Sequence, residues 1–135
     1  MNDYTKPIPT PSEDSVPYWE ATKSHELKLQ QCRVCKAFRF PPAEVCPECT
    51  SDAYDWKPVS GKARVFSFVI YHRAYHPGFK EELPYVVAVI ELDEGPRMLS
   101  NVIGCKPEEV RCDMPVEVAY EDITDDMTLP KFRPA

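Results

Sequence analysis

Residues 31–51 read QCRVCKAFRFPPAEVCPECTS and contain two C-x-x-C pairs. Each C-x-x-C turn can aim two thiolates at one point, and a tetrahedral metal ion needs two such turns. Between the pairs, Phe38 and Phe40 alternate with Arg39 as they would in a short strand. We therefore expect four thiolates to hold one metal ion: Cys32, Cys35, Cys46 and Cys49.

Zinc is the ion that we expect in this site, in a structural role. Four thiolates close the coordination shell, whereas a catalytic zinc keeps one position open for water. A dithiol redox motif is typically a single pair that opens a helix in a βαβ setting, but here there are two pairs and no such setting. Iron can bind the same four sulfurs and stays open as an alternative. Lys36 and Thr50 stand where many such turns have a glycine with a positive φ angle.

The chain has 135 residues, of which 43% are hydrophobic, and this is enough for one ordinary core. Its first residues are polar and proline-rich, without the apolar run of a signal peptide. The longest apolar run, Tyr85 to Ile90, is too short to cross a bilayer. We therefore expect a soluble cytoplasmic protein, in which cysteines stay reduced. Two further cysteines, Cys105 and Cys112, lack a C-x-x-C partner, and we expect them to be small buried residues.

The rest of the chain predicts β-strands separated by turns. Runs rich in β-branched and aromatic residues predict strands over residues 63–72, 84–92, 97–103, 115–121 and 128–129, with a single helical turn at 106–110. This number of strands suits a five-stranded barrel of the oligonucleotide- and oligosaccharide-binding (OB) type better than a sandwich. We predict a mainly β protein with a tail and helix over 1–30, a zinc ribbon over 31–58 and an OB-fold domain over 59–135.

One helix is predicted before the ribbon. Residues 12–17 combine cap-forming residues, acids and a proline, which is typical of a helix start. The helix should end near His25, because Leu27 and Leu29 alternate with polar residues as they would in a strand.

The order of helix, four-cysteine ribbon and barrel resembles a known family. The resemblance rests on PYWEATKSHELKLQQCRVC (17–35), PPAEVCPEC (41–49), GKARVFSFVIYHRAYHPGFKEELPYVVAVIELDEGPRMLSNVIGC (61–105) and MPVEVAYEDITDDMTLPKFRPA (114–135). These segments are similar to the acyl-CoA-associated OB-fold proteins with an N-terminal rubredoxin-like zinc ribbon, formerly a domain family of unknown function. The resemblance covers nearly the whole chain.

This resemblance implies an accessory subunit and not a free-standing enzyme. Members of the family associate with thiolase-fold enzymes, including thiolases, acyltransferases and the aldolases of steroid side-chain breakdown. Others are fused to, or paired with, acyl-CoA hydratase subunits. The resemblance therefore implies a hetero-oligomer in which the small protein stabilises its partner, helps to shape an acyl-CoA site or passes intermediates. The partner supplies the chemistry.

The segment YHRAYHPGFKEELPY, residues 71–85, is the candidate partner-facing or acyl-CoA-facing region. It gathers aromatic residues, two histidines and an arginine in a loop, and loops often carry recognition. The candidate residues are Tyr71, His72, Arg73, His76 and Phe79. A polar connection with a few packed rings explains the same pattern equally well.

Two other function classes were weighed. Zinc ribbons and OB barrels commonly bind nucleic acid, but the net charge is −6 and four thiolates on zinc would add two negative charges. Residues 23–39 do carry a local net charge of +4, from five basic residues and one acid. A metal-dependent enzyme acting alone would need an open metal site or an acid/base pair. The paired acids Glu81–Glu82 and Asp125–Asp126 are instead typical of a solvated surface.

Overall fold

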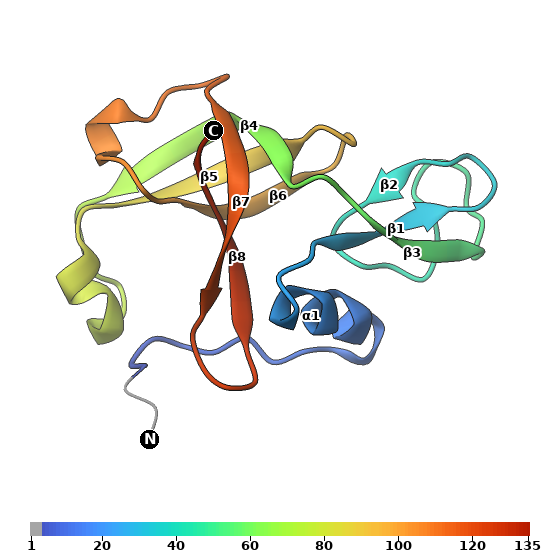
Figure 1. The fold of residues 1–135 in the computed structure, drawn as a ribbon, viewed down its shortest axis with the longest axis horizontal. Coiled ribbons are helices and arrows are strands. Elements are labelled where there is room, and N and C mark those ends of the chain that lie inside the picture. The colour runs from blue at the N-terminus through green and yellow to red at the C-terminus, as the bar shows by residue number, and fades with distance from the viewer. Residues whose placement is uncertain (1–3) are drawn as a thin grey trace.

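Helix α1 (Val16–Lys23) is the first regular helix in this computed structural model, which describes residues 4–135 (Figure 1). A 3-10 turn, Glu13–Ser15, leads into it. The helix ends with backbone hydrogen bonds from His25 to Thr22 and from Glu26 to Ala21, each 2.9 Å long. His25 takes the left-handed φ of 57° that this ending requires. The helix therefore ends within two residues of the predicted position.

The ribbon is a three-stranded antiparallel sheet in the order β2-β1-β3. Its strands are β1 (Lys28–Cys32), β2 (Phe38–Arg39) and β3 (Tyr54–Pro58). Strand β3 was not predicted. Its side chains are only partly buried or exposed, so no clear alternation marks it in the sequence. It forms because its backbone pairs with β1 over five residues.

A buried polar contact locks the ribbon hairpin. Gln30 Oε1 accepts hydrogen bonds from Arg39 Nε and from the backbone N–H of Ala43, each 2.8 Å long. Arg39 also donates to the carbonyl oxygen of Ala43 at 2.8 Å, and its guanidinium lies over the Tyr54 ring. Because Gln30 is fully buried and Arg39 is 6% exposed, loss of either partner would leave buried polar groups unpaired.

The barrel is closed by five strands in the order β4-β5-β6-β8-β7 (Figure 1). They are β4 (Lys62–Tyr71), β5 (Tyr85–Leu92), β6 (Arg97–Val102), β7 (Pro115–Asp122) and β8 (Thr128–Pro134). The predicted mainly β fold with a five-stranded barrel is confirmed. Strand β8 is longer than predicted, because it pairs with β7 along its whole length.

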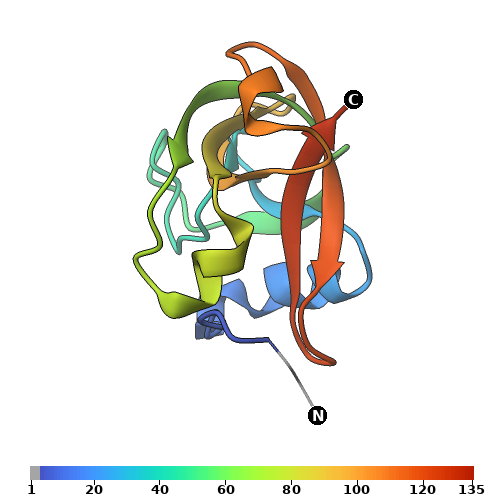
Figure 2. The same ribbon diagram turned by 90° about the vertical axis from the view of Figure 1, so that its left-hand side faces the viewer.

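Two 3-10 helices lie in the barrel connections. Helix η3 (Pro107–Glu109) falls where a single helical turn was predicted, whereas helix η2 (Pro77–Glu82) forms within the loop 72–84 and was not predicted. Figure 2 shows η2, in yellow-green, beside the start of the described chain, in blue. The segment 4–6 is therefore a neighbour of this loop, although many residues separate them in sequence.

Ribbon and barrel share one hydrophobic core. In β5 the buried residues alternate strictly, as Val86, Ala88, Ile90 and Leu92 point inward. Residues that precede the barrel join the same cluster: Tyr18, Leu27 and Leu29. The predicted domain boundaries at residues 30 and 58 stay predictions. No helix between residues 4 and 135 is long and apolar enough to cross a membrane.

The expectation for the two unpaired cysteines was wrong. Cys112 is exposed and Cys105 is only partly buried. Both lie in or beside the irregular connection around η3, where no strand face turns them inward.

His25 ties the end of α1 to the barrel. Its Nε2 lies 3.0 Å from Asp122 Oδ1, and its ring stacks on Tyr120 with centroids 5.0 Å apart. Thr128 Oγ1 donates to the same carboxylate. The hydrogen bonds from Thr128 and His25 lower the pKa of Asp122.

Replacing Phe132 by Ala should destabilise the fold strongly. Phe132 is fully buried where β8 meets β6 and β7, so its removal leaves a cavity and should cost about 3–5 kcal/mol. The free energy of unfolding, measured by urea denaturation, checks this. The control Leu99→Ala, at a position 67% exposed, should cost less than about 0.5 kcal/mol. Equal losses in the two variants would contradict the assigned core.

Replacing Asp122 by Asn should make stability less sensitive to acid. The pKa of Asp122 is lower in the folded chain than its ordinary value of 3.8. Its contribution is therefore present above that value and lost as the pH falls through the lower folded pKa. We expect the urea midpoint of the wild type to fall more steeply than that of Asp122→Asn below about pH 5. The control is Asp125→Asn, at an exposed position, and its slope should match the wild type.

Candidate functional site

The four predicted cysteines converge at the tip of the ribbon. The sulfurs of Cys32, Cys35, Cys46 and Cys49 all lie within 4.8 Å of one another. Cys32 Sγ is 3.5 Å from Cys49 Sγ, and Cys35 Sγ is 3.6 Å from Cys46 Sγ. Zn–S bonds of about 2.3 Å would place the sulfurs of a tetrahedral site about 3.8 Å apart. The sulfur positions therefore fit a four-thiolate metal site, although ligation itself stays a prediction.

The two cysteine turns have the same backbone design. The backbone N–H of Lys36 donates to the carbonyl oxygen of Cys32 at 3.1 Å, and that of Thr50 donates to Cys46 at 2.9 Å. Lys36 and Thr50 both take left-handed φ angles, 66° and 64°. These are the positions where many such turns carry glycine. Lys36 and Thr50 are therefore strained at both turns, which indicates that the turn geometry is needed to place the cysteines.

The backbone also favours thiolates at the first cysteine of each pair. A hydrogen bond from the backbone of Cys35 is the largest influence on Cys32, and it lowers the pKa of Cys32 to about 6. The backbone of Cys49 lowers the pKa of Cys46 in the same way. For Cys35, a backbone hydrogen bond from Ala37 lowers the pKa, but burial and the neighbouring thiols raise it to about 12. Four close sulfurs cannot all ionise without a cation between them, so metal binding here should release protons.

Four thiolates would leave no open coordination position. A metal held this way has no place for a water or substrate, in contrast to a catalytic zinc with three protein ligands. The cluster can therefore support the fold of the ribbon, but it does not offer hydrolytic chemistry.

The structure brings only some of the candidate loop residues together. Tyr71 and Phe79 both contact the ring of Tyr85, with centroid distances of 5.1 and 5.2 Å. The ring of His76 meets Phe79 edge-on, and its Nδ1 accepts a hydrogen bond from the backbone of Gly78 at 3.0 Å.

The two remaining candidates adjoin Tyr71 at the surface. His72 and Arg73 are exposed and line a shallow hollow with Tyr71 and Tyr75. The partner-facing role of all five residues stays a prediction.

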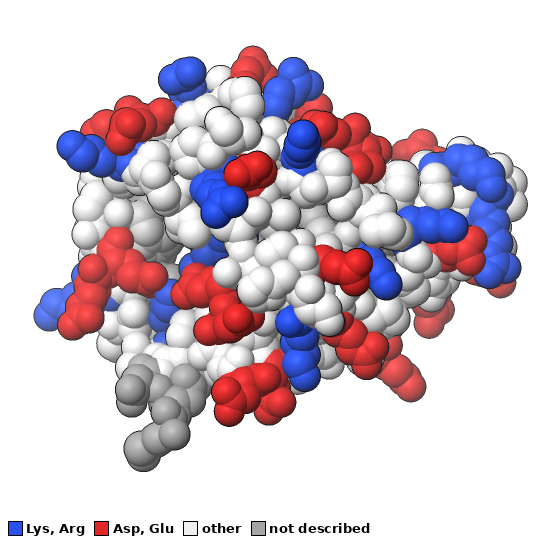
Figure 3. Space-filling model, in the orientation of Figure 1, with Lys and Arg blue, Asp and Glu red and all other residues white. Residues whose placement is uncertain are grey.

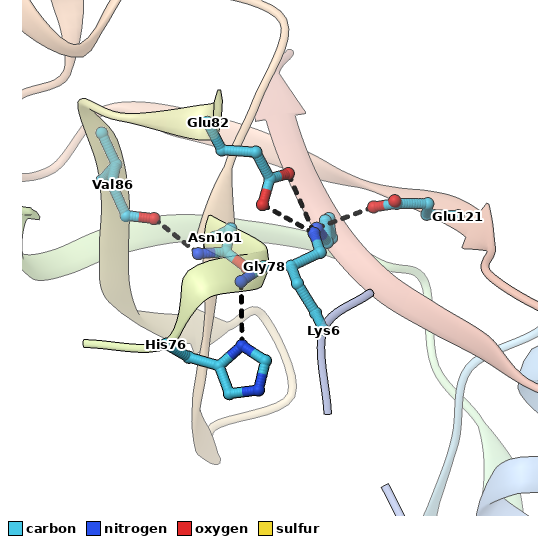
Figure 4. A network of polar contacts seen from close by, with 8 residues as sticks. Lys6, His76, Gly78, Glu82, Val86, Asn101 and Glu121 are labelled. Carbon is cyan, nitrogen blue, oxygen red and sulfur yellow. Dashed lines mark hydrogen bonds and ion pairs between the residues drawn. The ribbon is translucent and has the colours of Figure 1, made fainter. Parts of the chain in front are cut away.

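The segment 4–6 packs against the loop 72–84 and holds it in place. Lys6 Nζ contacts both carboxylate oxygens of Glu82, at 2.9 and 2.7 Å (Figure 4). It also lies over the Phe79 ring. Burial alone would lower the pKa of Lys6, but its hydrogen bond with Glu82 produces a net rise. Gly78 leaves room for this segment, because a Cβ there would lie 2.7 Å from the carbonyl oxygen of Thr5.

A cavity of about 330 Å³ lies between this segment and the barrel. Its lining includes Lys6, Tyr85, Cys105 and Lys131. The Lys131 ammonium is mostly buried and pairs with Glu121 at 2.7 Å. Both lysines that reach this cavity are therefore neutralised by a glutamate.

Sequence reasoning did not single out Tyr85 or Lys6. Tyr85 is the last residue of the candidate segment 71–85, so its position was inside the predicted region although the residue was not named. Lys6 reaches the loop through a tertiary contact that no local pattern marks.

Comparison with known proteins finds a family match for the ribbon and another for the barrel. Residues 19–55 match the family model described as "ChsH2, rubredoxin-like zinc ribbon domain", and residues 56–121 match "ChsH2, C-terminal OB-fold domain". A solved structure described as "Ltp2-ChsH2(DUF35) aldolase" contains a chain that is 37% identical, with a TM-score of 0.84. The match covers 93% of this chain and 98% of that one.

Two curated relatives have subunit or scaffold names. The "probable enoyl-CoA hydratase alpha subunit" of Thermomonospora curvata is 38% identical over 96% of this chain. This chain spans only 40% of the length of that relative. The "DUF35 domain-containing scaffold protein" of Methanocaldococcus jannaschii is 36% identical over 71% of this chain and 68% of its own length.

Replacing Cys46 by Ser should remove the metal and loosen the ribbon. The buried Cys46 sulfur is one of four predicted ligands, and structural metal ions contribute folding free energy directly. Elemental analysis should find one metal ion per wild-type chain and a marked loss in the variant, together with a lower melting temperature. The control Cys112→Ser, at an exposed cysteine, should keep both values. Full metal content and an unchanged melting curve in Cys46→Ser would remove this site from the account.

Proposed function

Because the chain belongs to the ChsH2 family, with its rubredoxin-like zinc ribbon and OB-fold domain, we propose that it is a non-catalytic accessory subunit of an acyl-CoA-processing enzyme. The observation that carries this proposal is the likeness, over 93% of the present chain, to a chain of the structure described as "Ltp2-ChsH2(DUF35) aldolase". The description of that structure names Ltp2 beside ChsH2. The scaffold name of the archaeal relative supports the same role.

The partner that we propose is a thiolase-fold enzyme or an acyl-CoA hydratase, in a hetero-oligomer in the cytoplasm. The hydratase subunit name and the aldolase description support these two classes. In the longer hydratase relative, the matched region is less than half of the protein.

The contacts of the titratable residues favour a non-catalytic role. Two of the three histidines have contacts that include no serine or cysteine: His25 contacts Asp122 and Tyr120, and His76 contacts Gly78 and Phe79. The four clustered cysteines face one another. A serine or cysteine within hydrogen-bond reach of a histidine would have been the sign of Ser–His or Cys–His catalysis.

For the metal we propose Zn²⁺, held by the four cysteines of the ribbon. The family model describes a zinc ribbon, and the sulfur positions fit a tetrahedral ion. Its role is to fix the two cysteine turns. Iron in the same site would be distinguished by elemental analysis and by visible absorption.

The nucleic-acid alternative loses support at the ribbon. Lysines and arginines gather along the outer end of the ribbon (Figure 3). However, Arg33 is paired with Asp55 at 2.7 Å and Arg39 is buried against Gln30. Fewer cations are therefore free to contact phosphates than the local sequence charge indicates.

The tagged protein, purified gently from its native cells, should bring down a thiolase-fold or hydratase subunit in stoichiometric amount. The isolated chain should not turn over acyl-CoA thioesters, because the partner holds the reacting groups. Mass spectrometry identifies the partner, and a free-thiol assay for released CoA or an absorbance assay for hydration measures turnover. Robust turnover by the isolated chain, free of partner, would show that the protein is itself an enzyme.

A further inference from the structure

The outer face of β4, β5 and β6 carries apolar side chains that the core does not use. Phe66, Val69 and Leu99 expose 46%, 54% and 67% of their surface, and Tyr75, just beyond β4, exposes 76%. Nine large hydrophobic residues are exposed among residues 4–135, and these four share one side of the barrel. We call this row the outer strip.

The register of the strands makes the outer strip continuous. Val69 lies opposite Val87, and Val89 lies between Ser67 on one side and Leu99 on the other. Val87 and Val89 are only partly buried, whereas their neighbours in β5 are fully inside the barrel. Val69, Val87, Val89 and Leu99 therefore form a connected apolar path from β4 to β6, and the polar Ser67 and Asn101 lie on the same face.

The outer strip continues into the loop through packed rings. The ring centroids of Tyr75 and Tyr71 are 5.9 Å apart, and Tyr71 then contacts Tyr85 at 5.1 Å. Two shallow hollows, of about 440 and 310 Å³, lie on this face and share Tyr71. Side chains of a docked protein could fill such hollows, which is how aromatic-rich interface centres are usually packed.

Positive charge borders both ends of the outer strip. At one end, Arg97 lies 3.6 Å above the Phe66 ring, and it shares Glu91 with Arg64 at 3.1 and 3.8 Å. Two arginines on one glutamate leave one net positive charge. At the other end, Arg73 lies over Tyr75, and none of the ion pairs among residues 4–135 includes Arg73. Arginine side chains therefore border the outer strip at both ends, although the chain as a whole carries −6 and Asp93 and Glu94 lie in the turn just before Arg97. By contrast, the face with β7 and β8 displays charges of both signs (Figure 3).

We infer that the outer strip is the docking surface for the partner enzyme, and that the partner presents an apolar row bordered by carboxylates at both ends. This inference rests on the proposed function and adds to it the surface and its chemistry. The strip supplies the dry centre of the interface, and Arg73 and Arg97 supply its charged rim. The predicted candidates Tyr71 and Arg73 belong to one end of this surface.

The test compares Leu99→Asp with Val34→Asp, because both side chains are 67% exposed but Val34 lies on the ribbon. The probe is the partner subunit identified by co-purification and then purified. Leu99→Asp should weaken binding at least about tenfold, since it places a charge in the apolar centre and repels the partner carboxylates. Val34→Asp should bind as the wild type does. Both variants are first shown to keep their metal content and melting temperature.

A second pair of variants tests the charged ends of the outer strip. Arg73→Glu combined with Arg97→Glu should slow association and flatten its dependence on salt, because rim charges act mainly on the association rate. The control is Arg111→Glu, at an exposed arginine outside the strip. An unchanged rate and salt dependence in the double variant would overturn the charge part of the inference.

The outcomes separate this inference from the proposed function. If the wild type binds an acyl-CoA enzyme and Leu99→Asp binds it equally well, the docking surface is wrong but the function stands. If the wild type binds no such enzyme, both fail. If the isolated wild type dimerises, or binds nucleic acid, and Leu99→Asp alone abolishes that binding, the strip belongs to that other occupant and the inference is overturned.

Discussion

The convergence of four cysteine sulfurs constrains the whole N-terminal half of the protein. The ribbon strands are short, and β2 has only two residues, so backbone pairing alone gives little stability there. The cysteine turns bring residues 32 and 49 together and thereby set the path of the hairpin between them. The buried contact of Gln30 with Arg39 depends on that path. A bound metal would hold the turns from one end, while the shared core holds the ribbon from the other.

The shared core has a consequence for function. Leu27 and Leu29 precede or lie in the ribbon yet pack with the barrel residues, and His25 bonds to Asp122 on β7. Ribbon and barrel are therefore held in one relative orientation. A rigid two-part surface suits a subunit that positions a partner, because little conformational entropy is lost when preorganised surfaces meet. The loop 72–84 is held in the same way, since Lys6 bonds to Glu82.

Much of this fold is readable from the sequence because its elements have local signals. The nearly continuous apolar run in residues 84–92 marks β5, and the cysteine spacing marks the predicted metal site. The rest depends on tertiary contacts. Strand β3 exists because it pairs with β1, helix η2 has no clear local pattern, and Lys6 reaches Glu82 across the fold. The outer strip could not be predicted, because a β-bulge between Val65 and Ser67 shifts the alternation in β4. Simple alternation from the buried Val65 would turn Val69 inward, whereas 54% of Val69 is exposed. Cys112 shows the opposite error, since a small apolar residue need not be buried.

Native mass spectrometry of the protein isolated from its own cells tests the central claim most directly, because one spectrum reports both assembly and metal. We expect a hetero-oligomer whose mass equals whole numbers of this chain and of a thiolase-fold or hydratase subunit, with one zinc ion for each copy of this chain. A spectrum that contains only this chain, or this chain without metal, would contradict it.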